Sequence, residues 1–403
     1  MRMENNLFQF ATKELSQDAF LCWAINWMVV SREGCPEYRL GEHVLNLFLG
    51  KENAVEHYEN VQVKRQYKHI DVLVLYKVRG IRHGLIIEDK TNSSEHDNQL
   101  QEYSKVLAKD ESLGITVQQI HIAYVKTGIH YDADKRANAN IVDLEQLLKV
   151  LTEYGRDVHS EILDQYITFL DAEFQKRIQI RKLIDSCDFT ALSPTVVEYD
   201  YDYKKPILGT YYGQFCFLNT LFPDRKIWQK IDLSLSQKVY YDYTDSIYSG
   251  ANRDGSPWTQ YCFWGQAYRG NLIDSKKKEA HYLFWRVDCH KSRGRNAQEY
   301  YIALRHYDEY AHQKEANETG KKANERKRKV YGVFREICDK LQKEYPEIIE
   351  HIGERAAYKE SDLIFIPISN LKMIGSGSIE EIGYFLKSIT DRVKKTYMMM
   401  CKN

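Results

Sequence analysis

The clearest pattern in the chain is a pair of short apolar runs. Apart from Asp71, residues 70–76 (IDVLVLY) and 85–87 (LII) are apolar on both faces and rich in β-branched side chains, which predicts strands covered on both sides. The link over 77–82 is short, so we expect these strands to be hairpin neighbours. An alternating stretch over 61–67 and an apolar stretch over 119–125 predict two more strands of the same sheet.

Helical patterns surround these strands. Thr12 is the predicted N-cap of a helix that runs to Ser31 and is nearly all apolar from Ala19 onward. Further helices are predicted over 40–49, from Ser94 onward, over 142–151 and over 160–180. These elements indicate an α/β (α+β) domain over residues 1–185, in which helices flank a mixed sheet.

Beyond Cys187 the pattern changes to aromatic-rich, alternating stretches. Strands are predicted over 199–203, 258–268, 281–287, 300–307 and 363–368, with a loop over 271–279 and helices over 330–345 and 379–400. We therefore expect a second α+β domain over 186–403. Its basic runs, at 276–278, 291–295 and 314–329, would suit nucleic-acid phosphates, but an aromatic core with solvated lysines is the simpler interpretation.

Charged side chains appear where the second buried strand ends. Glu88, Asp89 and Lys90 follow the apolar run, and alternation puts Glu88 and Lys90 on one face and Asp89 on the other. Pairing of the two strands would bring Asp71 towards Glu88. Two carboxylates beside a lysine suit Mg²⁺, which prefers oxygen ligands and retains several waters. The alternative is a solvated strand end with a surface ion pair.

A family resemblance rests on these residues. Asp71 followed by Glu88-Asp89-Lys90 resembles the PD-(D/E)XK nuclease superfamily, and Gln99 to Tyr103 matches the Q-x-x-x-Y motif of its lambda-exonuclease-like branch. The segment over 6–27 also looks like a family of uncharacterised bacterial proteins assigned to this superfamily, and the resemblance covers roughly the first 170 residues. The proline of the superfamily's name is absent, because Ile70 precedes Asp71.

The resemblance implies a fold, a chemistry and a set of ligands. The fold is a restriction-endonuclease-like sheet of four strands flanked by helices, and the chemistry is metal-dependent phosphodiester hydrolysis. Asp71, Glu88 and the carbonyl of Asp89 would bind Mg²⁺, with Mn²⁺ as a substitute. An acid of the first helix often joins such a site, and Glu14 is the first candidate, followed by Asp18.

Three side chains after Lys90 are candidates for holding the substrate. His96, Gln99 and Tyr103 have helical spacing and share one face of the predicted helix. The resemblance implies substrate contacts for Gln99 and Tyr103. His96 near a helix cap is more often solvated or bonded locally.

Composition bears on nucleic-acid binding, on metal sites and on the cellular compartment. The formal net charge is zero, so nucleic-acid binding would depend on local basic patches. The eight cysteines form no C-x-x-C pair, which argues against zinc and iron–sulfur sites and suits a reducing cytosol. We find no signal peptide or membrane span and expect a cytoplasmic protein.

The sequence thus predicts an Mg²⁺-dependent deoxyribonuclease with Asp71, Glu88 and Lys90 as its catalytic residues. A role in phage defence or mobile-element biology follows only by analogy. One rival is a catalytically inert module of the same fold that binds nucleic acid or protein, and another is an RNA-directed nuclease. The C-terminal domain is expected to recognise the target, to bind a regulatory partner or to mediate homo-oligomer formation.

Overall fold

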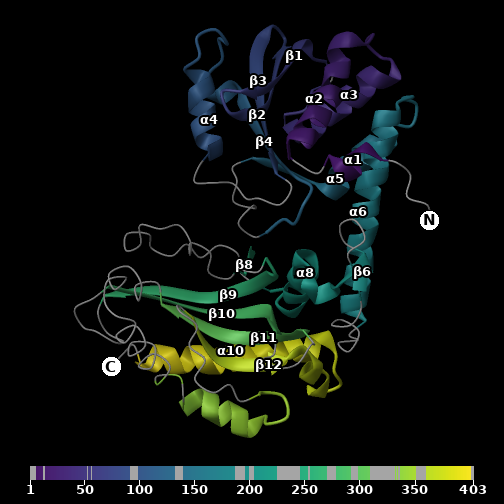
Figure 1. Cartoon of the computed structure of the whole chain (residues 1–403). Helices are drawn as coiled ribbons and strands as arrows, with labels where there is room; N and C mark the ends of the chain where they lie inside the picture. The colour runs from purple at the N-terminus through teal and green to yellow at the C-terminus, as the bar shows by residue number, and fades with distance from the viewer. Residues whose placement is uncertain are drawn as a thin grey trace. The chain divides into compact units, whose positions relative to one another are not determined.

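In the computed structural model the chain divides into two compact units, Met1–Lys176 and Arg177–Asn403. The division falls inside α6 (Glu161–Asp185), nine residues before the boundary expected at 185. The structure describes residues 6–11, 14–51, 53–55, 57–90, 99–131, 139–186, 196–198, 204–224, 246–252, 255–269, 278–291, 298–308, 332, 334, 336–350 and 360–400. Both units are mixed, with a β-sheet flanked by helices (Figure 1).

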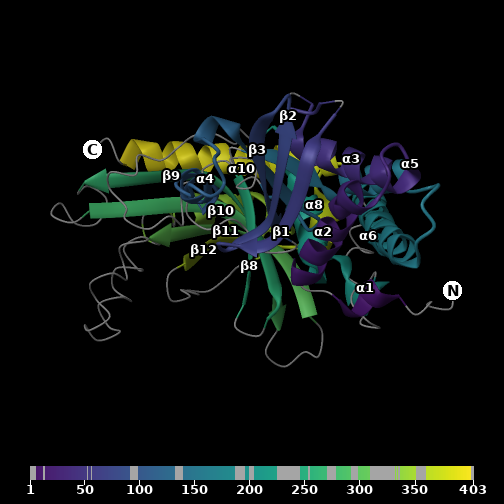
Figure 2. The same cartoon turned by 90° about the horizontal axis from the view of Figure 1, so that it is seen from above.

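The first unit contains a five-stranded sheet in the order β1-β2-β3-β4-β5. Its first three strands are labelled side by side in Figure 2. Its strands are β1 (Glu59–Tyr67), β2 (Ile70–Val78), β3 (Ile81–Lys90), β4 (Ile120–Lys126) and β5 (Asn140–Asp143). Its helices are α1 (Leu7–Phe10), α2 (Glu14–Val30), α3 (Pro36–Leu49), α4 (Gln99–Ala108), α5 (Leu144–Tyr154) and much of α6. The first three strands are antiparallel, whereas β3, β4 and β5 are parallel to one another.

The predicted hairpin between β2 and β3 is confirmed. Its turn is Arg79-Gly80, and both residues have positive φ (52° and 77°), as tight two-residue hairpin turns require. The strand over 61–67 pairs with the Asp71 strand, as expected. The sheet has five strands rather than the four that we expected, because Asn140–Asp143 is a strand and α5 begins only at Leu144. Four residues that lead directly into a helix cap carry too little periodicity to predict a strand.

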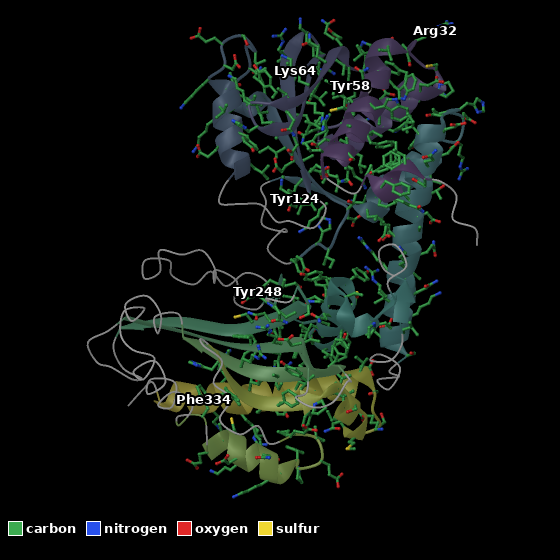
Figure 3. The ribbon with its side chains drawn as sticks, viewed as in Figure 1. Arg32, Tyr58, Lys64, Tyr124, Tyr248 and Phe334 are labelled. Carbon is green, nitrogen blue, oxygen red and sulfur yellow. The ribbon has the colours of Figure 1, made fainter. Side chains whose placement is uncertain are left out.

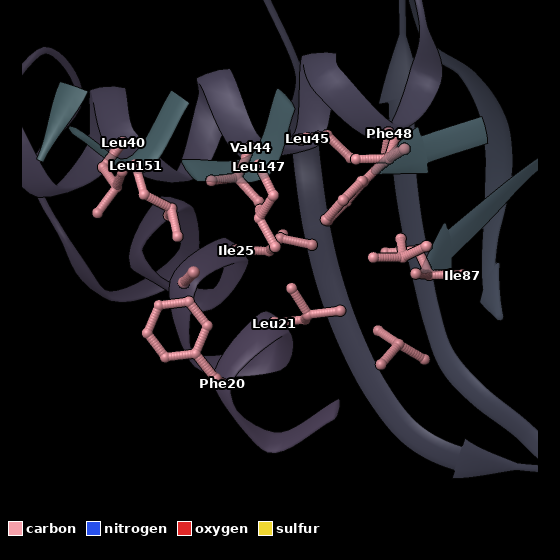
Figure 4. Close-up of a cluster of buried hydrophobic side chains, with 14 of the residues drawn as sticks. Phe20, Leu21, Ile25, Leu40, Val44, Leu45, Phe48, Ile87, Leu147 and Leu151 are labelled. Atoms are coloured by element: carbon pink, nitrogen blue, oxygen red, sulfur yellow. The ribbon is translucent and has the colours of Figure 1, made fainter. Parts of the chain in front are cut away.

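The sheet of the first unit has an apolar core on each face. On one face α2, α3 and α5 pack against β3, as shown by Leu21, Val44, Ile87 and Leu147 (Figure 4). On the other face a smaller cluster, which includes Leu73, Ile86 and Leu107, joins β2 and β3 to α4. Both faces of β3 are therefore covered, which is why its apolar run is uninterrupted.

The second unit contains a five-stranded sheet in the order β12-β11-β10-β9-β8 and a separate two-stranded sheet. The strands are β6 (Val196–Glu198), β7 (Lys204–Pro206), β8 (Ser246–Ala251), β9 (Pro257–Arg269), β10 (Lys278–Lys291), β11 (Gln298–Asp308) and β12 (Glu360–Pro367). The helices are α8 (Tyr211–Leu221) and α10 (Ile379–Met400), together with helical residues 332, 334 and 336–344. The larger sheet is antiparallel throughout.

The aromatic strands of this unit form a core, as the simpler interpretation predicted. Trp285 is fully buried and donates its indole N–H to Thr390 Oγ1 on α10 at 2.8 Å. The stretch over 199–203 lies outside the described residues, as do 270–277, 292–297 and 309–331, which hold most of the basic positions. The helix α8 was not predicted, because its sequence YYGQFCFLNTL contains four aromatic residues and a glycine, which favour helices weakly.

No helix among the described residues is long and apolar enough to cross a membrane.

Candidate active site

Asp71, Glu88 and Lys90 come together where β2 begins and β3 ends. Lys90 Nζ lies 2.5 Å from Glu88 Oε1 and 3.7 Å from Asp71 Oδ2. The hairpin register sets this arrangement, because Asp71 comes one position beyond the last paired residues, Val72 and Ile87. The Glu88 side chain is almost fully buried, whereas that of Asp71 is 20% exposed. One ammonium therefore contacts carboxylates from two adjacent strands, with Asp71 on the solvent side.

The neighbouring strand β4 continues alongside the charged end of β3. Glu88 lies beside Tyr124, and Lys90 beside Lys126, in a parallel register (Tyr124 is labelled in Figure 3). Lys126 is fully buried and its ammonium lies 5.3 Å from the centre of the Tyr131 ring. Because β3 and β4 are parallel, these polar side chains gather at the carboxyl ends of both strands.

Asp89 points to the opposite face of β3, as alternation predicts. Its Oδ1 accepts a hydrogen bond from Gln17 Nε2 of α2 at 2.6 Å, and the Gln17 carbonyl oxygen accepts one from Thr127 Oγ1 at 2.9 Å. The backbone N–H of Asp89 donates to Asp71 Oδ2 at 3.1 Å. Asp89 thus connects the buried helix α2 to the carboxylate of Asp71.

Asp18, an acid of α2, lies close to Asp71 and Asp89. Asp18 is 1% exposed, and burial together with the negative charge of Asp71 raises its pKa to about 6. Burial and the charges of Asp18 and Asp71 also raise the pKa of Asp89 well above its usual value. Asp18 Oδ1 and Asp89 Oδ2 accept no hydrogen bond from the described donors.

Gln66 joins this acid pair to the candidate catalytic residues. Its amide Nε2 lies 3.3 Å from both Asp18 Oδ2 and Asp71 Oδ1. The residue has φ of +54°, in the left-handed region that side chains other than glycine rarely adopt. Residues held in such conformations are concentrated at functional sites. The alternating pattern over 61–67 predicted a regular strand here and contained no signal for this conformation.

The remaining predicted site residues are placed only in part. The acid of α2 that reaches the site is Asp18, the second candidate, while the side chain of Glu14 lies outside the described residues. His96 and the side chain of Gln99 also lie outside them. Tyr103 donates its hydroxyl to the carbonyl oxygen of His69 at 2.8 Å, and so contacts the turn that precedes Asp71.

Gln17 is a functional candidate that sequence reasoning missed, although a signal was present. Gln17 precedes Leu21, Ala24 and Met28 at helical spacing, and all three are buried. A polar residue within an otherwise apolar helical stripe requires a buried hydrogen-bonding partner. Spacing alone could not identify that partner as Asp89.

The donor set limits the metals that this site could hold. Within the described part of the chain, no group of three or more His, Cys, Asp and Glu side chains is arranged to hold a metal ion. Asp71 and Glu88 form a pair of oxygen donors, and Mg²⁺ is commonly held by one or two carboxylates with water and phosphate completing its shell. The pair therefore fits Mg²⁺ or Mn²⁺ better than a metal that needs a complete protein shell.

Comparison of the chain with protein-family models, with curated proteins and with solved structures finds no match.

Proposed function

We propose that the protein is a metal-dependent nuclease that hydrolyses DNA phosphodiester bonds at Asp71, Glu88 and Lys90. The observation that carries this proposal is the contact of one lysine with carboxylates from two adjacent strands, at distances of 2.5 and 3.7 Å. A surface ion pair would leave both partners in water, whereas Glu88 is almost fully buried and the Lys90 side chain is 11% exposed.

Asp71 and Glu88 would hold the metal, with the Asp89 carbonyl as a further oxygen donor that the family resemblance implies. When bound, Mg²⁺ would polarise the phosphate and lower the pKa of a coordinated water. Lys90 would release the two carboxylates, orient the attacking water and stabilise negative charge that develops on the phosphate. Gln99 and Tyr103 would help to place the substrate.

The arrangement of the first unit supports membership of the PD-(D/E)XK superfamily. An antiparallel β1-β2-β3 meander is followed by α4 and the parallel strand β4, with α2 and α4 on opposite faces. The resemblance favours DNA over RNA as the substrate and leaves the second unit to recognise the target or to regulate cleavage. A cytoplasmic role in phage defence would suit such an enzyme.

Calorimetric titration with Mn²⁺ tests the metal site directly. We expect the wild-type protein to bind Mn²⁺ and Glu88→Gln to bind it at least about tenfold more weakly, because a ligand is lost. Glu102→Gln is the matched control, since Glu102 is an exposed acid of α4 paired with Lys105. Absence of binding, or equal binding by wild type and Glu88→Gln, would contradict the proposal.

A further inference from the structure

The Asp89 side chain has no place in the proposed chemistry, yet it is fully buried and hydrogen-bonded. It projects from β3 on the face opposite Glu88 and Lys90, towards α2. Leaving a buried carboxylate or amide without a partner is costly, so this contact constrains the strand end strongly. The same strand end carries both Glu88 and Lys90.

We infer that Gln17 is a positioning residue of the candidate active site, acting through Asp89. Gln17 donates to Asp89 Oδ1 at 2.6 Å and accepts from Thr127 at 2.9 Å, so its amide joins α2, β3 and the segment after β4. This inference rests on the proposed nuclease function.

The chain of contacts from Gln17 to the metal ligands is short. Asp89 lies between Glu88 and Lys90 in sequence, and its N–H donates to Asp71 Oδ2 at 3.1 Å. Fixing the Asp89 side chain therefore fixes the backbone that positions all three candidate catalytic residues. Partners of this kind, one step behind the ligands, commonly account for 10- to 100-fold in metal affinity or activity.

The orientation of the Gln17 amide is also determined. A carboxylate oxygen of Asp89 requires a donor, and the Thr127 hydroxyl donates to the opposite end of the amide. Reversing the amide would place its oxygen against the Asp89 oxygen and break that contact. An apolar residue would fill this position of the buried stripe on α2 without desolvating an amide, so packing alone does not account for a glutamine here.

A polarity exchange tests the inference. In Gln17→Glu two carboxylates would meet, and in Asp89→Asn the Gln17 amide would lose its carboxylate acceptor. The double variant Gln17→Glu/Asp89→Asn restores a hydrogen bond of reversed direction and leaves the total charge unchanged. Gln17→Leu removes the contact, and Gln165→Leu is the control, because Gln165 is a glutamine of α6 whose amide oxygen accepts a hydrogen bond from Leu7 N of α1.

The readouts are Mn²⁺ affinity, kcat and KM for a DNA substrate, and thermal unfolding to confirm folding. We expect Gln17→Leu and Gln17→Glu to lose about 10- to 100-fold in Mn²⁺ affinity and in kcat, with KM little changed, and the double variant to regain most of this loss. Gln165→Leu should match wild type in Mn²⁺ affinity and in kcat.

The results distinguish failure of the inference about Gln17 from failure of the nuclease proposal. If wild type binds Mn²⁺ and cuts DNA while folded Gln17→Leu does so equally well, the inference is wrong and the nuclease proposal stands. If the double variant remains as impaired as Gln17→Glu, Gln17 does not act through Asp89. A wild-type protein that neither binds Mn²⁺ nor cuts nucleic acid would overturn the nuclease proposal, and the inference with it.

Discussion

At the scale of single residues, the site places acids where their negative charge is unfavourable. Asp18 has a pKa of about 6, raised by burial and by the charge of Asp71. Its folded-state pKa lies above the unfolded value of 3.8, so the folded protein binds more protons between these limits. Stability therefore falls as pH rises from about 4 to 6, and the ionised acid remains destabilising at higher pH.

Asp18→Asn should remove this cost. We expect the variant to be more stable than wild type at pH 8, by about 1–3 kcal/mol, and the difference to shrink towards pH 4. Denaturant unfolding at the two pH values measures it, with Asp171→Asn as a control because Asp171 is an exposed acid of α6. A variant less stable than wild type at pH 8 would show that ionised Asp18 is stabilised by its surroundings.

Strand alternation predicted how the side chains at the end of β3 are arranged, but not the residues Gln17 and Gln66, which contact Asp89 and Asp71. Strand periodicity placed Glu88 and Lys90 on one face and Asp89 on the other, and the contacts of these residues agree. Gln66 and Gln17 were missed, because their partners Asp18 and Asp89 lie 48 and 72 residues away in sequence and meet them only in the folded chain. Helical spacing shows that Gln17 lies on a buried stripe, but it cannot identify a partner so far away in sequence.

At the level of secondary-structure elements, α2 packs closely on α3. Gln17 and Asp18 are the polar residues that α2 brings to the sheet. A Cβ at Gly41 of α3 would lie 2.9 Å from the Ala24 carbonyl oxygen and 2.9 Å from Met28 Cγ, both on α2. The helices can approach this closely only because position 41 lacks a side chain. The core in Figure 4 depends on this approach, since Leu21, Ile25, Val44 and Leu45 pack there.

Gly41→Val should therefore force the two helices apart. We expect it to lower the free energy of unfolding by about 1–3 kcal/mol, as overpacking of a dense core does. Arg39→Val is the control, because it places the same β-branched residue on the exposed face of α3. Chemical denaturation of the three proteins tests this, and equal loss in both variants would point to helix propensity instead of helix packing.

Strong periodicity predicted elements well, and burial decided the rest. The long helix Ile379–Met400 and the strands β9 to β12 occur where their patterns indicated. The strands β5 to β8 and the helix α8 were missed. The strands β5, β6 and β7 have only three or four residues, and the apolar and aromatic residues of α8 are buried against the second sheet. Tertiary contacts override local preference in such segments.

At the scale of the whole molecule, the chain has two units and no net charge. A nuclease with this balance would obtain its affinity for DNA from the few basic residues near its site, instead of from a broad positive field. Its cleavage should therefore depend on the metal and on Lys90 more than on general attraction between protein and DNA. The candidate chemistry is confined to the first unit, where the described contacts join α2, β1, β2, β3 and the segment after β4.

Cleavage of covalently closed plasmid DNA with Mg²⁺ or Mn²⁺ tests whether Asp71, Glu88 and Lys90 form a nuclease site. Wild type and Lys90→Ala are compared, with linear and single-stranded DNA as further substrates. We predict that wild type cuts the circle, that a chelator abolishes cutting, and that Lys90→Ala reduces the rate by at least about 100-fold. Lys105→Ala is the matched control, since this lysine is exposed on α4. Wild-type protein that cuts no DNA with either metal, or a Lys90→Ala variant as active as wild type, would contradict the nuclease proposal.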